Sequence, residues 1–378
     1  MDLDFSDDQK LLQDQLRRFL TERCTSAAVR AILEGPEPYD RSLYKGLAEL
    51  GALGAAIPEE YGGVGLGHLE LCLLAEELGR VVAPVPVASS IYLAAEFLLQ
   101  AGSEAQKRAW LPRLASAEAV GCFAFGESLG RVTPEKILAT VTDGRLSGVK
   151  WPVPDGDAAD FAVVAARAGG GQGARAISLF LVDLKAPGVK RETLETIDPT
   201  RSQARLTFDA APAEPLGGAG DGWFVAEQVL DRAAVLMAFE QLGGADRALE
   251  MARDYALDRM AFGRPIGSFQ AIKHMLADMY VAAALARSNA YYGAWALSAG
   301  SAELGVAAAT ARVSATQAFQ HCAKNNIQVH GGMGFTWAFD CHLYYRRSNM
   351  LALGLGSLST WEDLLIERMR RQNAPAAA

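Results

Sequence analysis

The C-terminal part of the chain contains three long stretches that read as helix, and this feature most constrains the fold. The stretches cover 221–260, 270–297 and 303–330, are rich in alanine, and repeat apolar residues at helical spacing. Helices of this length pack as a bundle, because each must bury an apolar stripe. The glycine pair Gly243-Gly244 is expected to interrupt the first of the three.

The sequence before these stretches changes character once. Helical spacing begins after an N-cap signal within Phe5-Ser6-Asp7-Asp8 and recurs at 43–54 and 69–80, with a proline- and glycine-rich loop at 58–67. Short runs rich in Val, Phe, Ile and Leu then follow at 119–127, 145–153, 160–167, 176–184 and 204–211. Strands at this spacing are typical of a sandwich or barrel.

The sequence therefore predicts an α+β multidomain protein. An N-terminal helical domain is expected over 1–118, a middle β-barrel or β-sandwich domain over 119–220, and a C-terminal four-helix bundle over 221–378. Glycine-rich segments such as 62–65 and 169–171 lie outside any strand-to-helix turn, so a dinucleotide-binding fold that opens with GxGxxG is not expected.

Composition excludes several functional classes. The formal net charge of -8 argues against a nucleic-acid binder, and no apolar run is long enough for a transmembrane helix. The five cysteines are scattered without a CxxC pair, and the histidines lack metal-ligand spacing, so neither a disulfide framework nor a metal site is expected. The acidic start MDLDFSDDQK does not resemble a signal peptide, and we therefore expect a cytoplasmic protein.

Four segments resemble the acyl-CoA dehydrogenase family, in family order along the chain. They are PEEYGGVGLG followed by LAEELGRVVAPVP (58–86), WLPRLASAEAVGCFAFGE (110–127), YALDRMAFGRPIGSFQAIKHMLADM (255–279) and IQVHGGMGFTWAFDCHLYYRRS (327–348). The chain looks most like bacterial members that act on bulky or steroid side-chain acyl-CoAs, some of which are heterotetramers.

The resemblance implies a bound FAD with an acyl-CoA thioester stacked on its flavin. A carboxylate removes the α-proton, and the β-hydrogen leaves as hydride to the flavin. Because the flavin supplies the redox chemistry, the protein supplies orientation and a base. Electrons then pass to an electron-transfer flavoprotein, as in fatty acid or steroid side-chain β-oxidation. Apolar stripes at 279–300 predict oligomerisation, and a homo- or hetero-tetramer is expected.

The same resemblance assigns the cofactor contacts. In this sequence the matching residues are Arg259, Phe262, Gln270, Gln328, His330, Gly331, Gly332, Phe125, Gly126 and Ser128. Arg259 is expected at the FAD diphosphate, because a guanidinium fork suits a dianion. Three of these assignments also have a plainer interpretation: Arg259 as a solvated arginine, Phe262 as a core residue, and Gly331-Gly332 as the turn that ends a helix. Pro152 and Pro154 occupy positions where relatives contact the flavin, and neither can donate a backbone hydrogen bond.

The catalytic base is not where the family usually has it. The two family positions match Gly356 and Ala233, and neither is acidic. Glu240 is the only charged residue between Arg232 and Asp246 and lies about two helical turns beyond Ala233. Burial in apolar surroundings brings a carboxylate's proton affinity nearer to what a general base needs. The resemblance to relatives with an AxEQxGGA pattern suggests Glu240 as the base.

Glu240 has an alternative role as a helix residue paired with Arg247 or with a partner subunit. Asp231 matches an aspartate near the CoA or acyl portion in relatives, so it is a predicted substrate-binding residue; it could equally be a surface residue paired with a neighbouring arginine.

Three functions remain open from the sequence. The first is a competent acyl-CoA dehydrogenase. The second is a non-catalytic partner subunit of a heterotetrameric acyl-CoA dehydrogenase. The third is a flavin oxidase or monooxygenase on the same fold, since a fold does not fix a reaction. The sequence does not identify the acyl chain.

Overall fold

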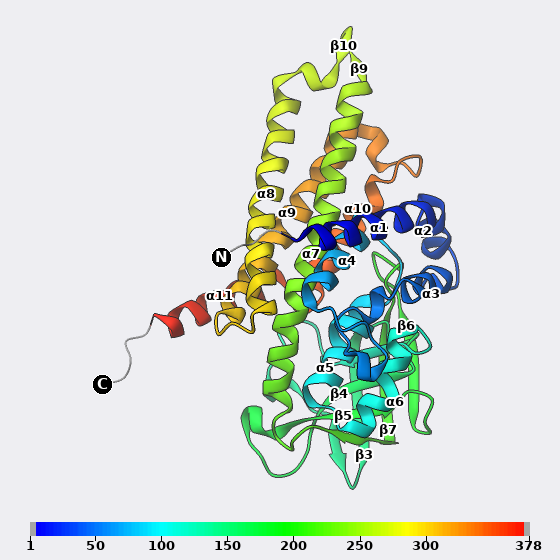
Figure 1. Ribbon diagram of the computed structural model, residues 1–378, viewed down its shortest axis with the longest axis vertical. Helices are drawn as coiled ribbons and strands as arrows, with labels where there is room; N and C mark the ends of the chain where they lie inside the picture. Colours follow the sequence, from blue (N-terminus) through cyan, green and yellow to red (C-terminus); the bar gives the residue numbers. More distant parts are fainter. Residues whose placement is uncertain (1–4, 374–378) are drawn as a thin grey trace. The chain divides into compact units, whose positions relative to one another are not determined.

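The structure, a computed structural model, describes residues 5–373 and has the predicted order of helices, strands and helices (Figure 1). The N-terminal helices are α1 (Asp7–Arg23), α2 (Ser26–Glu34), α3 (Arg41–Glu49), α4 (His68–Arg80), α5 (Glu96–Ala101) and α6 (Glu104–Ala115). The first begins where the sequence predicts it, because the Ser6 hydroxyl accepts the Gln9 N–H and the Gln9 side chain accepts the Ser6 N–H. The predicted fold class is confirmed.

The middle of the chain forms one eight-stranded sheet. Its strands are β1 (Gly121–Ala124), β2 (Thr140–Thr142), β3 (Arg145–Pro154), β4 (Phe161–Arg167), β5 (Ile177–Asp183), β6 (Val189–Leu194), β7 (Gln203–Pro212) and β8 (Glu214–Leu216). They follow the order β6-β7-β3-β2-β4-β5-β8, and β1 pairs in parallel with β4. The five predicted runs are β1, β3, β4, β5 and β7.

Three strands were not predicted, for local reasons. β2 and β8 have three residues each, too few to show a period. β6 has the sequence VKRETL, lies at the end of the strand order and exposes most of its side chains. Such an edge strand has no apolar alternation to recognise, and its charges discourage pairing with other chains.

The C-terminal helices reproduce the predicted stretches with one correction. They are α7 (Gly222–Asp258), α8 (Gln270–Ser298), α9 (Leu304–His330), α10 (Cys341–Leu353) and α11 (Leu358–Gln372). The expected interruption at Gly243-Gly244 is wrong, because α7 runs through both glycines. A Cβ at Gly243 would lie 1.9 Å from the Glu76 carbonyl oxygen, and one at Gly244 would lie 2.4 Å from the Phe319 ring. These glycines allow close packing rather than a break.

The chain separates into two compact units that do not follow chain order. One comprises Met1–Val29, His68–Ala83 and Ala234–Ala378; the other comprises Arg30–Gly67 and Pro84–Ala233. The helical unit therefore takes α1 and α4 from the N-terminal part, and α7 contributes to both units. The predicted three-domain division at 118 and 220 stays a prediction.

Within 5–373, no helix has the length and apolar character needed to cross a membrane. The same residues contain no group of three or more His, Cys, Asp or Glu side chains arranged to hold a metal ion.

Candidate functional site

A short hairpin joins α7 to α8 and carries one predicted cofactor residue, Phe262 (Figure 1). Its strands are β9 (Met260–Ala261) and β10 (Arg264–Pro265). The turn residues Phe262 and Gly263 have φ of 53° and 77°, which is the backbone of a two-residue hairpin turn. Phe262 is 95% exposed, so its plainer interpretation as a core residue is wrong. A phenylalanine held in this position is available to a ligand or another chain.

Arg259 and Gln270 stand at the two helix ends beside this hairpin. Arg259 directly follows α7, and its backbone N–H donates to the Tyr255 carbonyl. Gln270 is the first residue of α8. Both residues are exposed, so their polar groups can reach a ligand at the hairpin.

The end of α9 carries the other predicted cofactor residues. Gly331 has φ of 60° and ends the helix, with its N–H donating to the Gln328 carbonyl. A Cβ at Gly331 or Gly332 would meet nothing within 4 Å, so their backbone is open to an approaching group. The two interpretations of this segment, a helix end and a close backbone approach, are compatible.

His330 is buried and differs from its neighbours in this segment. Its Nδ1 lies 2.9 Å from the Asn326 carbonyl oxygen, and its ring stacks on Tyr255 with centroids 4.0 Å apart. Burial lowers the pKa of His330. Tyr255 lies four residues before Arg259, so this stack brings the 255–279 and 327–348 segments together. Sequence reasoning missed Tyr255, although it opens the first of these segments.

The predicted flavin-ring loop lies in the other compact unit, directly after β1. Phe125 stacks on Phe123 at 4.9 Å and lies 5.4 Å from Trp223 between ring centroids, while Ser128 is exposed. The Gly126 carbonyl accepts the Trp151 N–H at 3.0 Å.

The two prolines follow on β3. The Trp151–Pro152 peptide is cis, and the pairing of β3 with β7 shifts register between Lys150 and Val153. Pro152 is exposed and Pro154 is half-buried.

Glu240 lies in the interior of the helical unit. Its side chain is 1% exposed, and its Oε1 lies 3.6 Å from Nη1 of Arg347, which is equally buried. Arg347 also donates to the carbonyls of Val82 and Ala83, at 3.1 and 3.2 Å. Arg247, the partner suggested from the sequence, binds Glu250 at 3.2 Å. Sequence reasoning did not predict the contact of Glu240 with Arg347, because about a hundred residues separate the two in the chain.

The two family positions for a base have different surroundings. Ala233 is fully buried in α7. Gly356 has φ of 108° and follows a turn whose Gly354 carbonyl accepts the buried Arg312 guanidinium at 2.6 Å. Burial lowers the pKa of Arg312 to about 9, and the charge of Glu240 opposes this shift. Glu240 is thus the anion that acts on both buried arginines, Arg312 and Arg347.

Asp231 is half-buried on α7, in the unit that contains the sheet. The adjacent Arg232 pairs with Glu96 at 3.3 Å. The predicted role of Asp231 in substrate binding stays a prediction.

Two family models match most of the chain. The N-terminal domain model of acyl-CoA dehydrogenase matches 6–118, and the C-terminal domain model matches 220–369. Acyl-CoA dehydrogenase IpdE2 of Mycobacterium tuberculosis is 33% identical over 345 residues, which cover 91% of each chain.

Two solved structures have the same fold over nearly the whole chain. A steroid acyl-CoA dehydrogenase, Tcur3481-Tcur3483, is 32% identical with a TM-score of 0.88, covering 98% of this chain and 99% of that one. The ChsE4-ChsE5 complex from Mycobacterium tuberculosis is 28% identical with a TM-score of 0.88, covering 100% of both chains.

These matches together cover most of the chain, and the matched family consists of oxidoreductases. The chain belongs to the acyl-CoA dehydrogenase family. It is accordingly an enzyme of the class that oxidises the CH–CH bond of acyl-CoA thioesters, in a family that is generally FAD-dependent.

Proposed function

We propose that this chain catalyses FAD-dependent α,β-dehydrogenation of an acyl-CoA and passes the electrons to an electron-transfer flavoprotein. The observation that carries the proposal is the stack of Tyr255 on His330. It brings two segments of the family together and leaves Arg259, Gly331 and Gly332 exposed beside it. FAD, when bound, supplies the two-electron acceptor that no side chain provides.

The residues present fit FAD. The exposed Arg259 guanidinium suits a diphosphate, and the open backbone at Gly331 and Gly332 admits a phosphate closely. Gln270, Gln328 and Phe262 are exposed around the same helix ends and offer amide and ring contacts. In the sheet unit, Phe125, Gly126 and Ser128 are proposed to lie beside the flavin ring.

For the base, we propose Glu240. A base must carry negative charge before it takes the α-proton, and a neighbouring guanidinium such as that of Arg347 stabilises negative charge. Burial excludes water from the carboxylate, which is favourable for proton abstraction from carbon. Asp231 is proposed to contact the substrate.

The test of the base compares two buried glutamates. Glu240→Gln should lower acyl-CoA-dependent flavin bleaching by roughly 100-fold or more while FAD stays bound, because it removes the proton acceptor. Glu76→Gln is the matched control, since Glu76 is also buried and paired with an arginine in the same unit. Equal turnover of wild type and Glu240→Gln would remove Glu240 from this role.

A second candidate is a non-catalytic partner subunit in a heterotetramer. It is favoured by the absence of an acid at Gly356 and Ala233 and by the ion pair that occupies Glu240. One solved relative is a complex of two named chains, ChsE4 and ChsE5. On this candidate, the buried Glu240 serves as a counter-ion for Arg312 and Arg347.

Flavin content distinguishes the two candidates. The visible absorbance of the purified chain gives FAD per chain, alone and after co-expression with a homologous chain from the same source. One FAD per chain and turnover by the chain alone support the catalytic enzyme. Colour and activity that appear only on co-expression support the partner subunit.

The proposed substrate is a bulky acyl-CoA, such as a steroid side-chain or fatty acyl thioester. The expected cytoplasmic location stays a prediction.

A further inference from the structure

A buried lysine lies directly behind the loop that is proposed to hold the flavin ring. Lys150 lies on β3 and is 0% exposed. Its ammonium is 2.7 Å from Oε1 of Glu127 and donates to the Phe125 carbonyl at 3.1 Å. An ammonium loses much solvation free energy on burial, so this arrangement needs a reason beyond packing.

The carboxylate of Glu127, which lies in the same loop, accepts several hydrogen bonds. Besides Lys150, it accepts the backbone N–H of Leu138 at 2.8 Å and of Ala139 at 3.0 Å. It is 10% exposed. The pair therefore joins β3, the loop after β1 and the segment before β2 into one hydrogen-bonded group.

Two successive carbonyls of the loop point toward β3. The Phe125 carbonyl accepts a hydrogen bond from the Lys150 ammonium, and the Gly126 carbonyl accepts the Trp151 N–H at 3.0 Å. In a trans peptide the N–H points opposite to the C=O of the same plane. The N–H groups of Gly126 and Glu127 are consequently directed to the other side of the loop, away from β3.

We propose that Lys150 is a positioning residue: through the Phe125 carbonyl and Glu127, it orients these two N–H groups toward the polar edge of the bound flavin ring. This inference rests on the proposed function, because it assumes that the loop at 125–128 faces FAD. A polar ligand edge accounts for a charged pair at a place where an apolar pair would pack at lower cost.

Titration of Lys150 supplies a readout that packing alone would not give. Burial lowers the pKa of Lys150 to about 8, and the charge of Glu127 opposes this shift. Three other cations of this unit are engaged elsewhere: Arg205 lies over the Trp151 ring at 5.0 Å, Arg167 donates to the Ile137 and Pro134 carbonyls, and Lys136 donates to the Arg131 carbonyl. Loss of the Lys150 charge above about pH 8 should therefore loosen the loop.

The experiment titrates FAD into the full-length chain after flavin removal, with its partner chain if co-expression proves necessary. Lys150→Met should weaken FAD binding by roughly tenfold or more, because a charge-assisted hydrogen bond to the loop is lost. The double variant Lys150→Met with Glu127→Gln leaves no unpaired buried carboxylate, so it should fold and still bind FAD weakly. Lys185→Met, an exposed lysine paired with Asp160, is the control and should bind FAD normally.

The pH dependence gives the second readout. Wild-type affinity for FAD should fall with a midpoint near pH 8, as should that of Lys185→Met, and the two variants that lack Lys150 should lack that midpoint. A double variant that binds FAD with wild-type affinity and pH profile would overturn the role of Lys150 while leaving the proposed function intact. A wild-type chain that binds no FAD, alone or with its partner, would overturn both.

Discussion

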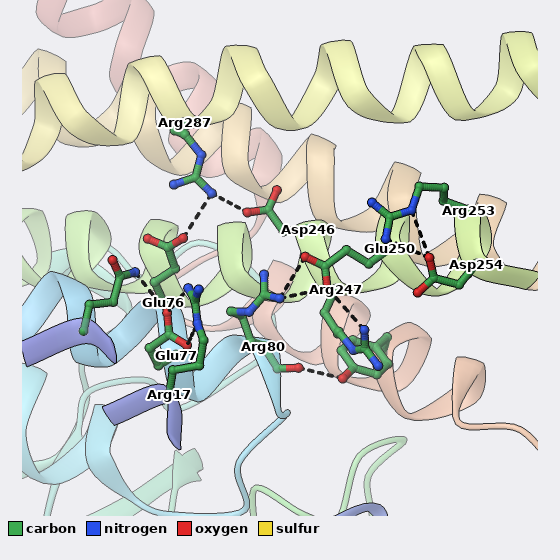
Figure 2. Close-up of polar contacts among 12 residues, drawn as sticks. Arg17, Glu76, Glu77, Arg80, Asp246, Arg247, Glu250, Arg253, Asp254 and Arg287 are labelled. Atoms are coloured by element: carbon green, nitrogen blue, oxygen red, sulfur yellow. Dashed lines mark hydrogen bonds and ion pairs between the residues drawn. The ribbon is translucent and has the colours of Figure 1, made fainter. Parts of the chain in front are cut away.

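Several buried carboxylates of the helical unit lie against an arginine from a different helix (Figure 2). Arg287 of α8 binds both Glu76 of α4, at 3.0 Å, and Asp246 of α7. Arg17 of α1 binds Glu77 at 2.6 Å. Burial raises the pKa of Glu76 and of Asp246, and Arg287 opposes both shifts. These pairs join four helices through charge, and removal of one partner leaves a buried charge uncompensated.

Arg287→Met should therefore destabilise the protein by about 3–5 kcal/mol at pH 8, measured by urea unfolding. A buried acid whose folded pKa is raised holds its proton more tightly when folded, so its contribution to stability is present at low pH and lost as pH rises. The deficit of the variant should accordingly be smaller at pH 5 than at pH 8. Arg253→Met breaks an exposed pair with Asp254 and should change stability by no more than about 0.5 kcal/mol. An equal deficit at both pH values would contradict this account.

Among the elements, α4 and α7 approach each other closely through reciprocal glycines. A Cβ at Gly79 of α4 would lie 1.8 Å from the Glu240 carbonyl oxygen, and one at Gly243 of α7 would lie 1.9 Å from that of Glu76. Each helix thus places a glycine against the backbone of the other, three residues from the glutamate that it contributes. The close approach of α4 and α7 therefore also sets the backbone positions of Glu76 and Glu240.

Gly243→Ala should destabilise the fold by about 1–3 kcal/mol or more, although alanine favours helix, because the added methyl meets backbone that cannot move aside. Gly293→Ala on α8 is the comparison, since the atoms nearest to its Cβ would be side-chain atoms of Ala311 and Val235, at 3.2 Å or more. Thermal unfolding should show the larger loss for Gly243→Ala. Equal midpoints for the two variants would mean that the crossing tolerates a wider spacing.

At the scale of the whole molecule, the relevant feature is one face of α8 that exposes apolar side chains. Tyr280, Val281 and Leu285 are each more than half exposed, whereas Met279, Ala283 and Ala286 are buried. An exposed apolar helix face is typical of a surface covered by another chain. This observation supports the proposed tetramer, in which such faces meet between copies or between two related chains.

The variant Val281→Glu with Leu285→Glu should give a smaller particle in light scattering, because two carboxylates cannot be buried without partners. Circular dichroism should show unchanged helix content. Leu11→Glu places a charge at an exposed leucine of α1 and should leave the particle size unchanged. An unaltered mass for the α8 variant would assign the assembly surface to another part of the chain.

The local sequence determined the elements and the family. Helical spacing set α8 and α9 nearly to the residue, and the 255–279 and 327–348 segments identified the family, because both signals depend on residues close in sequence. Only the tertiary structure decided how distant residues meet. The pairing of Glu240 with Arg347, the stack of Tyr255 on His330, and the continuity of α7 through Gly243 depend on contacts with other helices, which no local period records.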